Sequence, residues 1–166
     1  SGNGAANRAK SFMLMTNEKK HLILEDALLD CNKKARGDGE REIGNLDKRA
    51  DYLAVVDSVI AKHVYQAFRK NPNQEPQKSI QATQVKAIAD SFGMINSAFN
   101  PLELLVCMGS QTKDKDVLFQ PAIGIYESSD FEGQLPSLGK PKVMITELPE
   151  IGVQGAVAYH LYKRGR

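Results

Sequence analysis

Apolar residues recur at alternating spacings of three and four across residues 40–70, which carry the longest helical pattern in the chain. The stripe positions are Ile43, Leu46, Ala50, Leu53, Asp57, Ile60, Val64 and Ala67. From Tyr52 onward a second apolar row runs beside this stripe, formed by Val55, Val56, Val59 and Phe68. A helix that is apolar on two flanks needs packing partners on both flanks. The pattern therefore predicts one long helix at the centre of the fold.

Helical patterns also lie on both sides of this segment. A first helix is predicted from the cap Thr16 to the glycine stop signal at residues 37–39. The short link to the long helix then indicates an antiparallel helical hairpin. Residues 71–78 contain two prolines and no large apolar side chain, so they are expected to form a solvated loop. A further helix is predicted from Ser79 to Gly93.

A capping signal opens the next element. Asn100 at the cap, Pro101 at the first helical position and Glu103 at the third are typical of a helix start. Residues 102–108, which follow, are apolar on nearly every side of a helix. A short helix without a polar face is expected either to be buried or to dock on another chain.

The pattern changes to alternation after this point. Residues 117–126 alternate between apolar and polar positions, which predicts a strand, and Pro121 predicts an edge or a break within it. After a long loop rich in glycine, serine and proline, residues 142–147 are predicted to form a second short strand. The two strands are expected to pair as an antiparallel hairpin. A last helix is predicted near residues 152–162, before a basic tail.

These elements together predict an α+β fold that is predominantly helical. We expect a bundle of about four helices around the long central helix, with a small antiparallel β-hairpin and a C-terminal helix. Residues 1–10 are small and polar, so a flexible N-terminal segment is expected there. Residues 11–166 are expected to form one domain, with its helical part at 16–109 and the hairpin plus the C-terminal helix at 116–162.

The charge balance and the cysteines restrict the class of protein. The 166-residue chain has a net charge of +2, from 22 basic and 20 acidic residues, which argues against wholesale neutralisation of a nucleic-acid backbone. Cys31 and Cys107 lie on apolar stripes of separate predicted helices, so free thiols in the cytoplasm or another reducing compartment are expected. No apolar run approaches the ~18 residues that span a bilayer, so no membrane contact is expected.

No sequence motif indicates a catalytic, cofactor-binding or metal-binding residue. The glycines do not spell a phosphate loop, and no G-x-S-x-G element occurs. The chain has three histidines, His21, His63 and His160. None of them has a cysteine or a carboxylate at the sequence spacing that is typical of metal ligands. His21 and His63 fall on helical faces that are expected to pack together, either as a pH-sensitive or catalytic pair or as structural histidines, and the structural interpretation is favoured. Asp57, on the apolar stripe, is expected to pair with a basic side chain or to reach solvent.

The sequence favours a non-enzymatic protein–protein interaction or assembly subunit, which binds another protein or a second copy of itself. The predicted contact residues come from the short apolar helix and the edge strand: Leu102, Leu105, Phe119, Ile123 and Ile125. One alternative is a nucleic-acid-associated protein that uses the basic N-terminal third and the C-terminal tail. Its predicted contacts are Tyr162, Lys163, Arg164 and Arg166. A second alternative is an enzyme whose site is not visible as a sequence motif.

Overall fold

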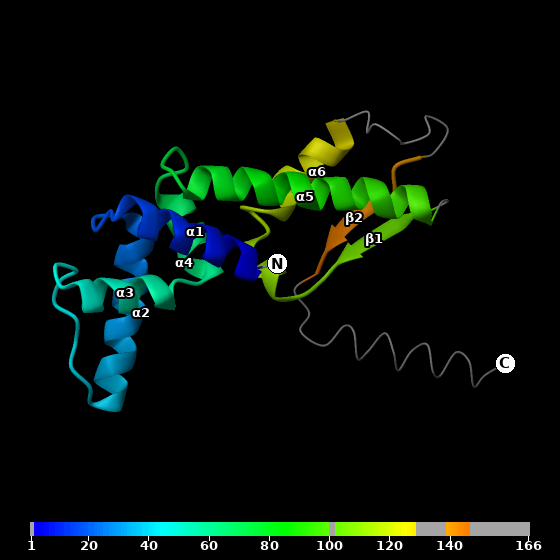
Figure 1. The fold of residues 1–166 in the computed structure, drawn as a ribbon. Helices are drawn as coiled ribbons and strands as arrows, with labels where there is room; N and C mark the ends of the chain where they lie inside the picture. The colour runs from blue at the N-terminus through cyan, green and yellow to red at the C-terminus, as the bar shows by residue number, and fades with distance from the viewer. Residues whose placement is uncertain (1, 100–101, 129–138, 147–166) are drawn as a thin grey trace, which may run out of the picture. The chain divides into compact units, whose positions relative to one another are not determined.

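The computed structural model describes residues 2–99, 102–128 and 139–146, and Figure 1 draws their helices and strands as a ribbon. These residues form six α-helices, one 3-10 helix and a sheet of two strands. The predominantly helical class predicted from the sequence is therefore confirmed. None of the helices in the described residues is long and apolar enough to cross a membrane.

The chain forms two compact units, Ser1–Ala87 and Ile88–Arg166. Helix α5 (Gln77–Ala98) contributes residues to both units, and each unit is described by itself below. The helix that the sequence predicts from Ser79 to Gly93 is thus longer at both ends. The expectation of one domain over residues 11–166 stays a prediction.

Four helices share one core in the first unit: α1 (Gly2–Thr16), α2 (Leu22–Asp38), α3 (Arg49–Ser58) and α4 (Ala61–Lys70). Helix α4 packs against α1 and α2, and helix α3 packs against the same two helices. The side chains that are almost completely buried here include Met13, Ile23, Leu24, Tyr52, Val55, Val64 and Tyr65.

The prediction of one long central helix over residues 40–70 is wrong, because helices α3 and α4 are separate. The chain between them is extended at Val59 and Ile60, with ψ angles of 127° and 168°. Adjacent β-branched residues have low helix propensity. In addition, the ring of His63 accepts the Ile60 N–H at 3.2 Å and so helps to start a new helix. The two apolar rows seen in the sequence therefore belong to two helices.

Residues 40–48 are not helical, because a side chain from α2 binds their backbone. The Asn32 amide donates to the carbonyl of Ile43 at 2.9 Å and accepts from its N–H at 2.8 Å. Backbone groups that are bound in this way are not available to a helical hydrogen-bond ladder. Leu46, farther along the same segment, is buried without belonging to a helix.

Residues 2–10 form the first part of helix α1 instead of a flexible segment. Ala5, Ala9 and Met13 recur every four residues on this helix and are fully buried. Alanine has the highest helix propensity, and tertiary packing supplies most of the stability of a helix. The small residues that indicated flexibility in the sequence thus form a packed helical face.

Helix α2 begins later than the sequence predicts, with His21 as its cap in place of Thr16. The Thr16 hydroxyl donates instead to the carbonyl of Phe12 within α1, at 2.9 Å. Asn17 follows with a φ of 51°, a left-handed conformation that asparagine tolerates, and α1 ends there. The glycine stop signal is confirmed, because Gly39 ends α2 with a φ of 70°.

The second unit contains strand β1 (Leu104–Cys107), 3-10 helix η1 (Ser110–Asp114), helix α6 (Phe119–Ser128) and strand β2 (Lys142–Ile145), besides the end of α5. Strands β1 and β2 pair in parallel, with Leu104 opposite Lys142 and Cys107 opposite Ile145. The predicted antiparallel hairpin is therefore wrong. Parallel strands need a crossover connection, and α6 lies in that connection.

In this unit, one segment predicted as a helix is a strand, and one segment predicted as a strand is a helix. Residues 102–108, predicted as a helix, contain strand β1, and residues 117–126, predicted as a strand, contain most of helix α6. The side chains of Leu118, Ala122 and Tyr126 recur every four residues and are fully buried, as on a helix. Pro121 lies in the first turn of α6, where a missing N–H costs no helical hydrogen bond. Only β2 falls where a strand was predicted.

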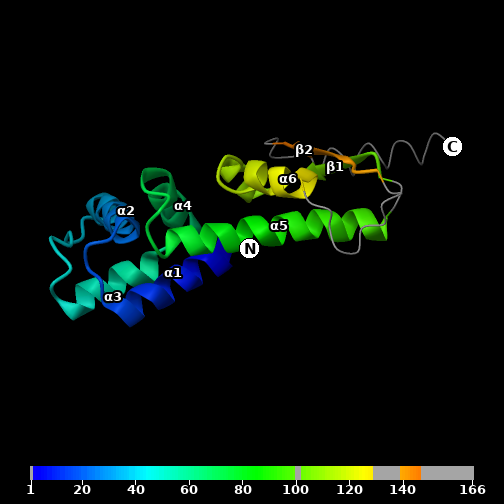
Figure 2. The ribbon, with the colours of Figure 1, turned by 90° about the horizontal axis from the view of Figure 1, so that it is seen from above.

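Helix α6 packs on the second half of α5. The rings of Phe92 and Tyr126 meet edge to face, with centroids 5.7 Å apart. The Lys140 ammonium donates to the last carbonyls of α6, those of Tyr126 and Glu127, at 2.9 and 2.8 Å. A cation at this position suits the negative end of the helix dipole. Figure 2 shows α6 and both strands on the same side of this half of α5.

Candidate functional site

The two strands present an apolar surface to solvent. Side chains alternate across a sheet, and the parallel register places Leu104, Val106 and Met144 on one face of it. These three side chains are 43%, 41% and 44% exposed, and we call them the sheet face. Lys142, beside Leu104 in the register, is also exposed on this side. The residues of the opposite face are half-buried: Leu105, Cys107, Val143 and Ile145.

The edges of the sheet are open as well. In the part of the chain that the structure describes, the sheet has only β1 and β2, so neither strand has a neighbour on its outer side. An edge without a neighbour presents backbone N–H and C=O groups that another strand is able to bind. Both strands are four residues long, and the 3-10 helix η1 follows β1.

The five residues predicted to contact a protein partner differ in how far they are buried. Leu102, Leu105 and Ile123 are half-buried, and Phe119 is buried. Ile125, on α6, is the exposed member of the set. Leu105 lies on the opposite side of β1 from the sheet face. The structure therefore does not bring the five together as one exposed surface.

The three residues of the sheet face were not predicted from the sequence. Leu104 and Val106 belong to the apolar run at 102–108, and treating this run as a helix hides the alternation between its two sides. A strand assignment would have separated Leu104 and Val106 from Leu105 and Cys107. The predicted nucleic-acid contacts, Tyr162, Lys163, Arg164 and Arg166, and the predicted C-terminal helix lie outside the described residues.

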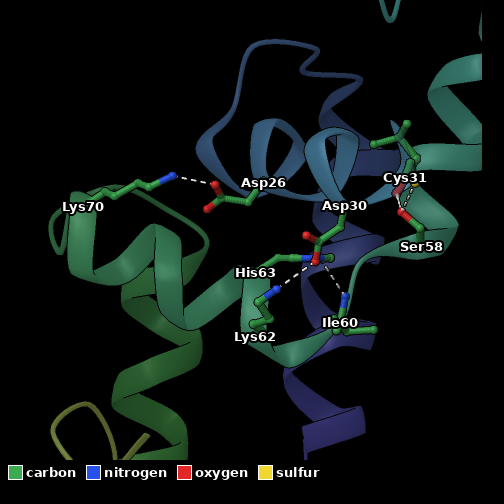
Figure 3. Close-up of polar contacts among 9 residues, drawn as sticks. Asp26, Asp30, Cys31, Ser58, Ile60, Lys62, His63 and Lys70 are labelled. Atoms are coloured by element: carbon green, nitrogen blue, oxygen red, sulfur yellow. Dashed lines mark hydrogen bonds and ion pairs between the residues drawn. The ribbon is translucent and has the colours of Figure 1, made fainter. Parts of the chain in front are cut away.

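A second polar cluster joins α2 to α4 in the first unit. Figure 3 shows Asp30 of α2 between Lys62 and His63 of α4. One carboxylate oxygen of Asp30 accepts from the Lys62 ammonium at 2.9 Å and from Nε2 of His63 at 3.0 Å. One turn earlier, the Asp26 carboxylate accepts from the Lys70 ammonium at 2.5 Å. Two ion-paired contacts thus hold the helices together.

Both ring nitrogens of His63 have hydrogen-bond partners in the first unit. Its Nδ1 accepts the backbone N–H of Ile60, so the proton of the neutral ring is on Nε2, which donates to Asp30. A general base needs a free ring nitrogen near a nucleophile. Both nitrogens are occupied here, and the nearby Cys31 thiol instead contacts the Ser58 hydroxyl at 3.1 Å. The cluster thus links the start of α4 to α2.

His21 also has both ring nitrogens occupied. Its Nδ1 accepts the backbone N–H of Ile23 at 3.1 Å, and its Nε2 donates to the carbonyl of Glu75 at 2.8 Å. The ring meets that of Phe12 edge to face, with centroids 6.4 Å apart. His21 and His63 thus act separately, each at the start of a helix. The structural interpretation of the two residues stays a prediction.

The remaining candidates do not form a site. Asp57 is 92% exposed and lies 3.6 Å from the Lys10 ammonium, so it both reaches solvent and has a basic partner. Cys31 and Cys107 are free thiols and half-buried, and burial raises the pKa of the Cys107 thiol. Among the residues that the structure describes, no group of three histidine, cysteine or acidic side chains is placed to hold a metal ion.

The sheet face, an exposed apolar surface of the second unit, is therefore the candidate functional site. Comparison with protein-family models, with curated proteins and with solved structures finds no match for this chain.

Proposed function

We propose that this protein is a non-enzymatic subunit for protein–protein interaction or assembly, and that its contact surface is the sheet face. The observation that carries this proposal is the exposure of Leu104, Val106 and Met144 on a parallel sheet. Parallel sheets in proteins are normally covered on both faces, so an apolar face left open favours a covering partner.

The energetics indicate what kind of contact is needed. Burial of a whole Val, Leu or Met side chain contributes about 1.5–3 kcal/mol, so completing the burial of one that is partly covered contributes about 1 kcal/mol. The sheet face then supplies about 3 kcal/mol, less than the roughly 4–15 kcal/mol that association costs in translational and rotational freedom. A stable contact has to include more than these three side chains.

The open edges of the sheet supply the additional contacts. A strand from a partner that pairs with β1 or β2 gains backbone hydrogen bonds, and its alternate side chains extend the apolar face. Met108, which is 49% exposed directly after β1, adds to the available surface. We therefore propose strand addition at the edge of the sheet, with the sheet face covered at the same time.

The histidine geometry supports the non-enzymatic part of the proposal. Histidine is the side chain that most often acts as a general acid or base, and it needs an available ring nitrogen. The ring nitrogens of His21 and His63 are engaged with backbone and carboxylate partners in the first unit. The nucleic-acid alternative, which uses the basic N-terminal third and the C-terminal tail, stays a prediction.

Self-association is the first form of the proposal to test. Light scattering of wild type and of Val106→Lys across micromolar concentrations measures self-association directly. We expect wild type to associate and Val106→Lys to be monomeric, because a charge on the sheet face opposes its burial. Gln120→Lys is the matched control, since it adds the same charge at an exposed position of α6 and should leave association unchanged.

A contact with a different protein gives another result. A photo-crosslinker placed at Val106 should then join this protein to one defined partner in the cells that make it, and Gln120 is the control position. Monomeric wild type without any crosslink specific to Val106 contradicts the proposal. Retention on nucleic acid that decreases steeply with salt favours the nucleic-acid alternative instead.

A further inference from the structure

We infer that a second copy of this chain is the partner at the sheet, and that the outer edge of β1 pairs antiparallel with β1 of that copy. This partner rests on the proposed function, and the backbone of the sheet specifies which edge and which register the contact uses. The hydrogen bonds between β1 and β2 decide this, because they determine which backbone groups are left for another strand.

The outer edge of β1 is formed by the backbone of two residues of the sheet face. At the start of the ladder, the Lys142 N–H donates to the carbonyl of Glu103 at 3.0 Å. Backbone groups alternate between the two sides of a strand, and Leu104 is the register partner of Lys142. The N–H and C=O groups of Leu104 and Val106 therefore face away from β2. These two residues present both their side chains and their backbone groups to a partner.

The outer edge of β2 is less suited to a partner. By the same alternation, its outward positions are 143 and 145, preceded by Pro141. Pro141 has no N–H, and it is buried. Next to it, the Lys140 ammonium donates to the last carbonyls of α6, so the start of β2 lies against the end of this helix. Proline at an edge blocks pairing, whereas residues 102–109 along β1 contain none.

The open edge of β1 is complementary to itself. Two identical strands that pair about a two-fold axis are antiparallel, and an axis at Leu105 places Leu104 of each copy opposite Val106 of the other. Both residues face the edge with their backbone groups, so each such pair exchanges two backbone hydrogen bonds. The next pair on the same face joins Leu102 to Met108 and is apolar as well. This register therefore uses every outward group of β1.

The charges of the sheet agree with this register. Lys142 lies beside Leu104, so the lysines of the two copies are at diagonally opposite corners of the joined sheet. Three strand spacings of about 4.8 Å place them at least about 14 Å apart, beyond the Debye length of about 8 Å at physiological salt. Glu103, on the other face, is opposite Cys107 of the second copy and not opposite a carboxylate. Repulsion between the copies is therefore small.

The pairing converts two marginal sheets into one of common size. Two strands alone are marginally stable, whereas sheets of four strands are frequent. Since a two-fold axis perpendicular to the sheet keeps the same side of both copies together, Leu104, Val106 and Met144 of the two copies form one apolar surface. This joined surface is twice as large as the sheet face of one copy. It supplies the larger contact that the proposed function requires.

Hydrogen exchange of single amides, measured by NMR on the wild-type full chain at several concentrations, tests which edge is used. The amides of Leu104 and Val106 face solvent in a single copy and the second β1 in the dimer. An amide that exchanges only from the monomer is protected by the ratio of dimer to monomer, so we expect about tenfold protection where this ratio is about ten. The amides of Val143 and Ile145, on the outer edge of β2, are the internal control and should not change with concentration.

A cysteine at the two-fold axis tests the register. Leu105 of the two copies forms a non-hydrogen-bonded pair in this arrangement, with Cα atoms about 4.5 Å apart, within the span of a disulfide. Leu105→Cys, with Cys31 and Cys107 replaced by serine, should therefore give a disulfide-linked dimer on oxidation at micromolar concentration. Val143→Cys in the same background is the matched control, because Val143 is the register partner of Leu105 and is also half-buried. It should stay monomeric on non-reducing electrophoresis.

The possible results distinguish this pairing from the proposed function. A dimer whose Leu104 and Val106 amides gain no protection overturns the pairing and leaves self-association in place. Protection of these amides without a disulfide in a folded Leu105→Cys variant overturns the two-fold register. Monomeric wild type that crosslinks from Val106 to one different protein overturns the second copy as partner but keeps the proposed function. Monomeric wild type without such a crosslink overturns both.

Discussion

The ring of His63 donates a hydrogen bond from Nε2 to the Asp30 carboxylate at 3.0 Å, and this bond links helix α4 to helix α2. The same oxygen accepts from the Lys62 ammonium. The bond from His63 is the largest cause that holds the pKa of Asp30 below its ordinary value, and the bond from Lys62 is the next. The Asp30 side chain is half-exposed, so solvent limits the contribution of these contacts to stability.

The direction of this shift predicts a dependence of stability on pH. A carboxyl whose pKa is lowered by folding stabilises the fold above its unfolded pKa, which is near 4, and the stabilisation is lost as pH falls through the lower folded pKa. Urea unfolding between about pH 5 and about pH 2 should therefore show decreasing stability in wild type and a smaller decrease in Asp30→Asn. Asp57→Asn, which changes an exposed carboxyl, should keep the wild-type slope. An equal slope in Asp30→Asn contradicts the prediction.

The hydroxyl of Tyr52 is expected to make a measurable contribution to stability. It donates to the carbonyl of Met13 at 2.5 Å and so joins α3 to α1, and burial raises the pKa of Tyr52. Tyr52→Phe should lower the free energy of unfolding by about 0.5–1.5 kcal/mol. A larger loss is not expected, because the Met13 carbonyl keeps its bond from the Asn17 N–H. An unfolding midpoint equal to that of wild type argues against this bond.

Because α3 and α4 are separate, substitutions at two nearby apolar residues, Ile60 and Val64, are expected to differ in their effect on stability. One long helix would place Ile60 and Val64 on the same buried stripe. In the structure Val64 is fully buried, whereas Ile60 is 51% exposed. Val64→Ala should cost about 1–3 kcal/mol and Ile60→Ala less than about 1 kcal/mol. Chemical unfolding of the two variants compares these costs, and equal costs would support the continuous helix.

Helices could be predicted from the helical period of the sequence where no side chain binds the backbone and interrupts the helix. Helix α2 and its stop at Gly39, and most of helix α5, follow from the helical period and the position of glycine. The separation of α3 from α4 did not follow, because it depends on the ring of His63 at Ile60. The irregular segment at 40–48 depends in the same way on Asn32, a residue from another element. The Asn32 contact joins separate elements and cannot be identified from a local pattern, whereas the His63 ring binds a residue only three positions earlier.

The candidate site could not be predicted for a related reason. A short apolar run is equally compatible with a buried helix and with a strand. For Leu104–Cys107, the capping residues before the run favoured a helix, whereas pairing with Lys142–Ile145 makes a strand. This pairing joins segments that are far apart in the sequence. The identity of the exposed side chains, Leu104, Val106 and Met144, depends on it.

The parallel register itself can be tested by a crosslink on the sheet face. Val106 and Met144 are register partners, and neighbouring strands lie about 4.8 Å apart, within the Cα distance that a disulfide spans. The double variant Val106→Cys/Met144→Cys, with Cys31 and Cys107 replaced by serine, should therefore form an intramolecular disulfide on oxidation at low protein concentration. Intact mass and non-reducing electrophoresis would detect it.

The control for this crosslink moves one cysteine by two residues. Val106→Cys/Lys142→Cys keeps both thiols on the same face, but their Cα atoms should be about 8 Å apart, too far for a disulfide without movement of the backbone. We expect no efficient crosslink in this variant. If the control pair forms the disulfide and the register pair does not, the strands pair differently. A shift of two residues would keep Leu104, Val106 and Met144 on one face, because side chains alternate with a period of two, but it would place Met144 opposite Met108 instead of Val106.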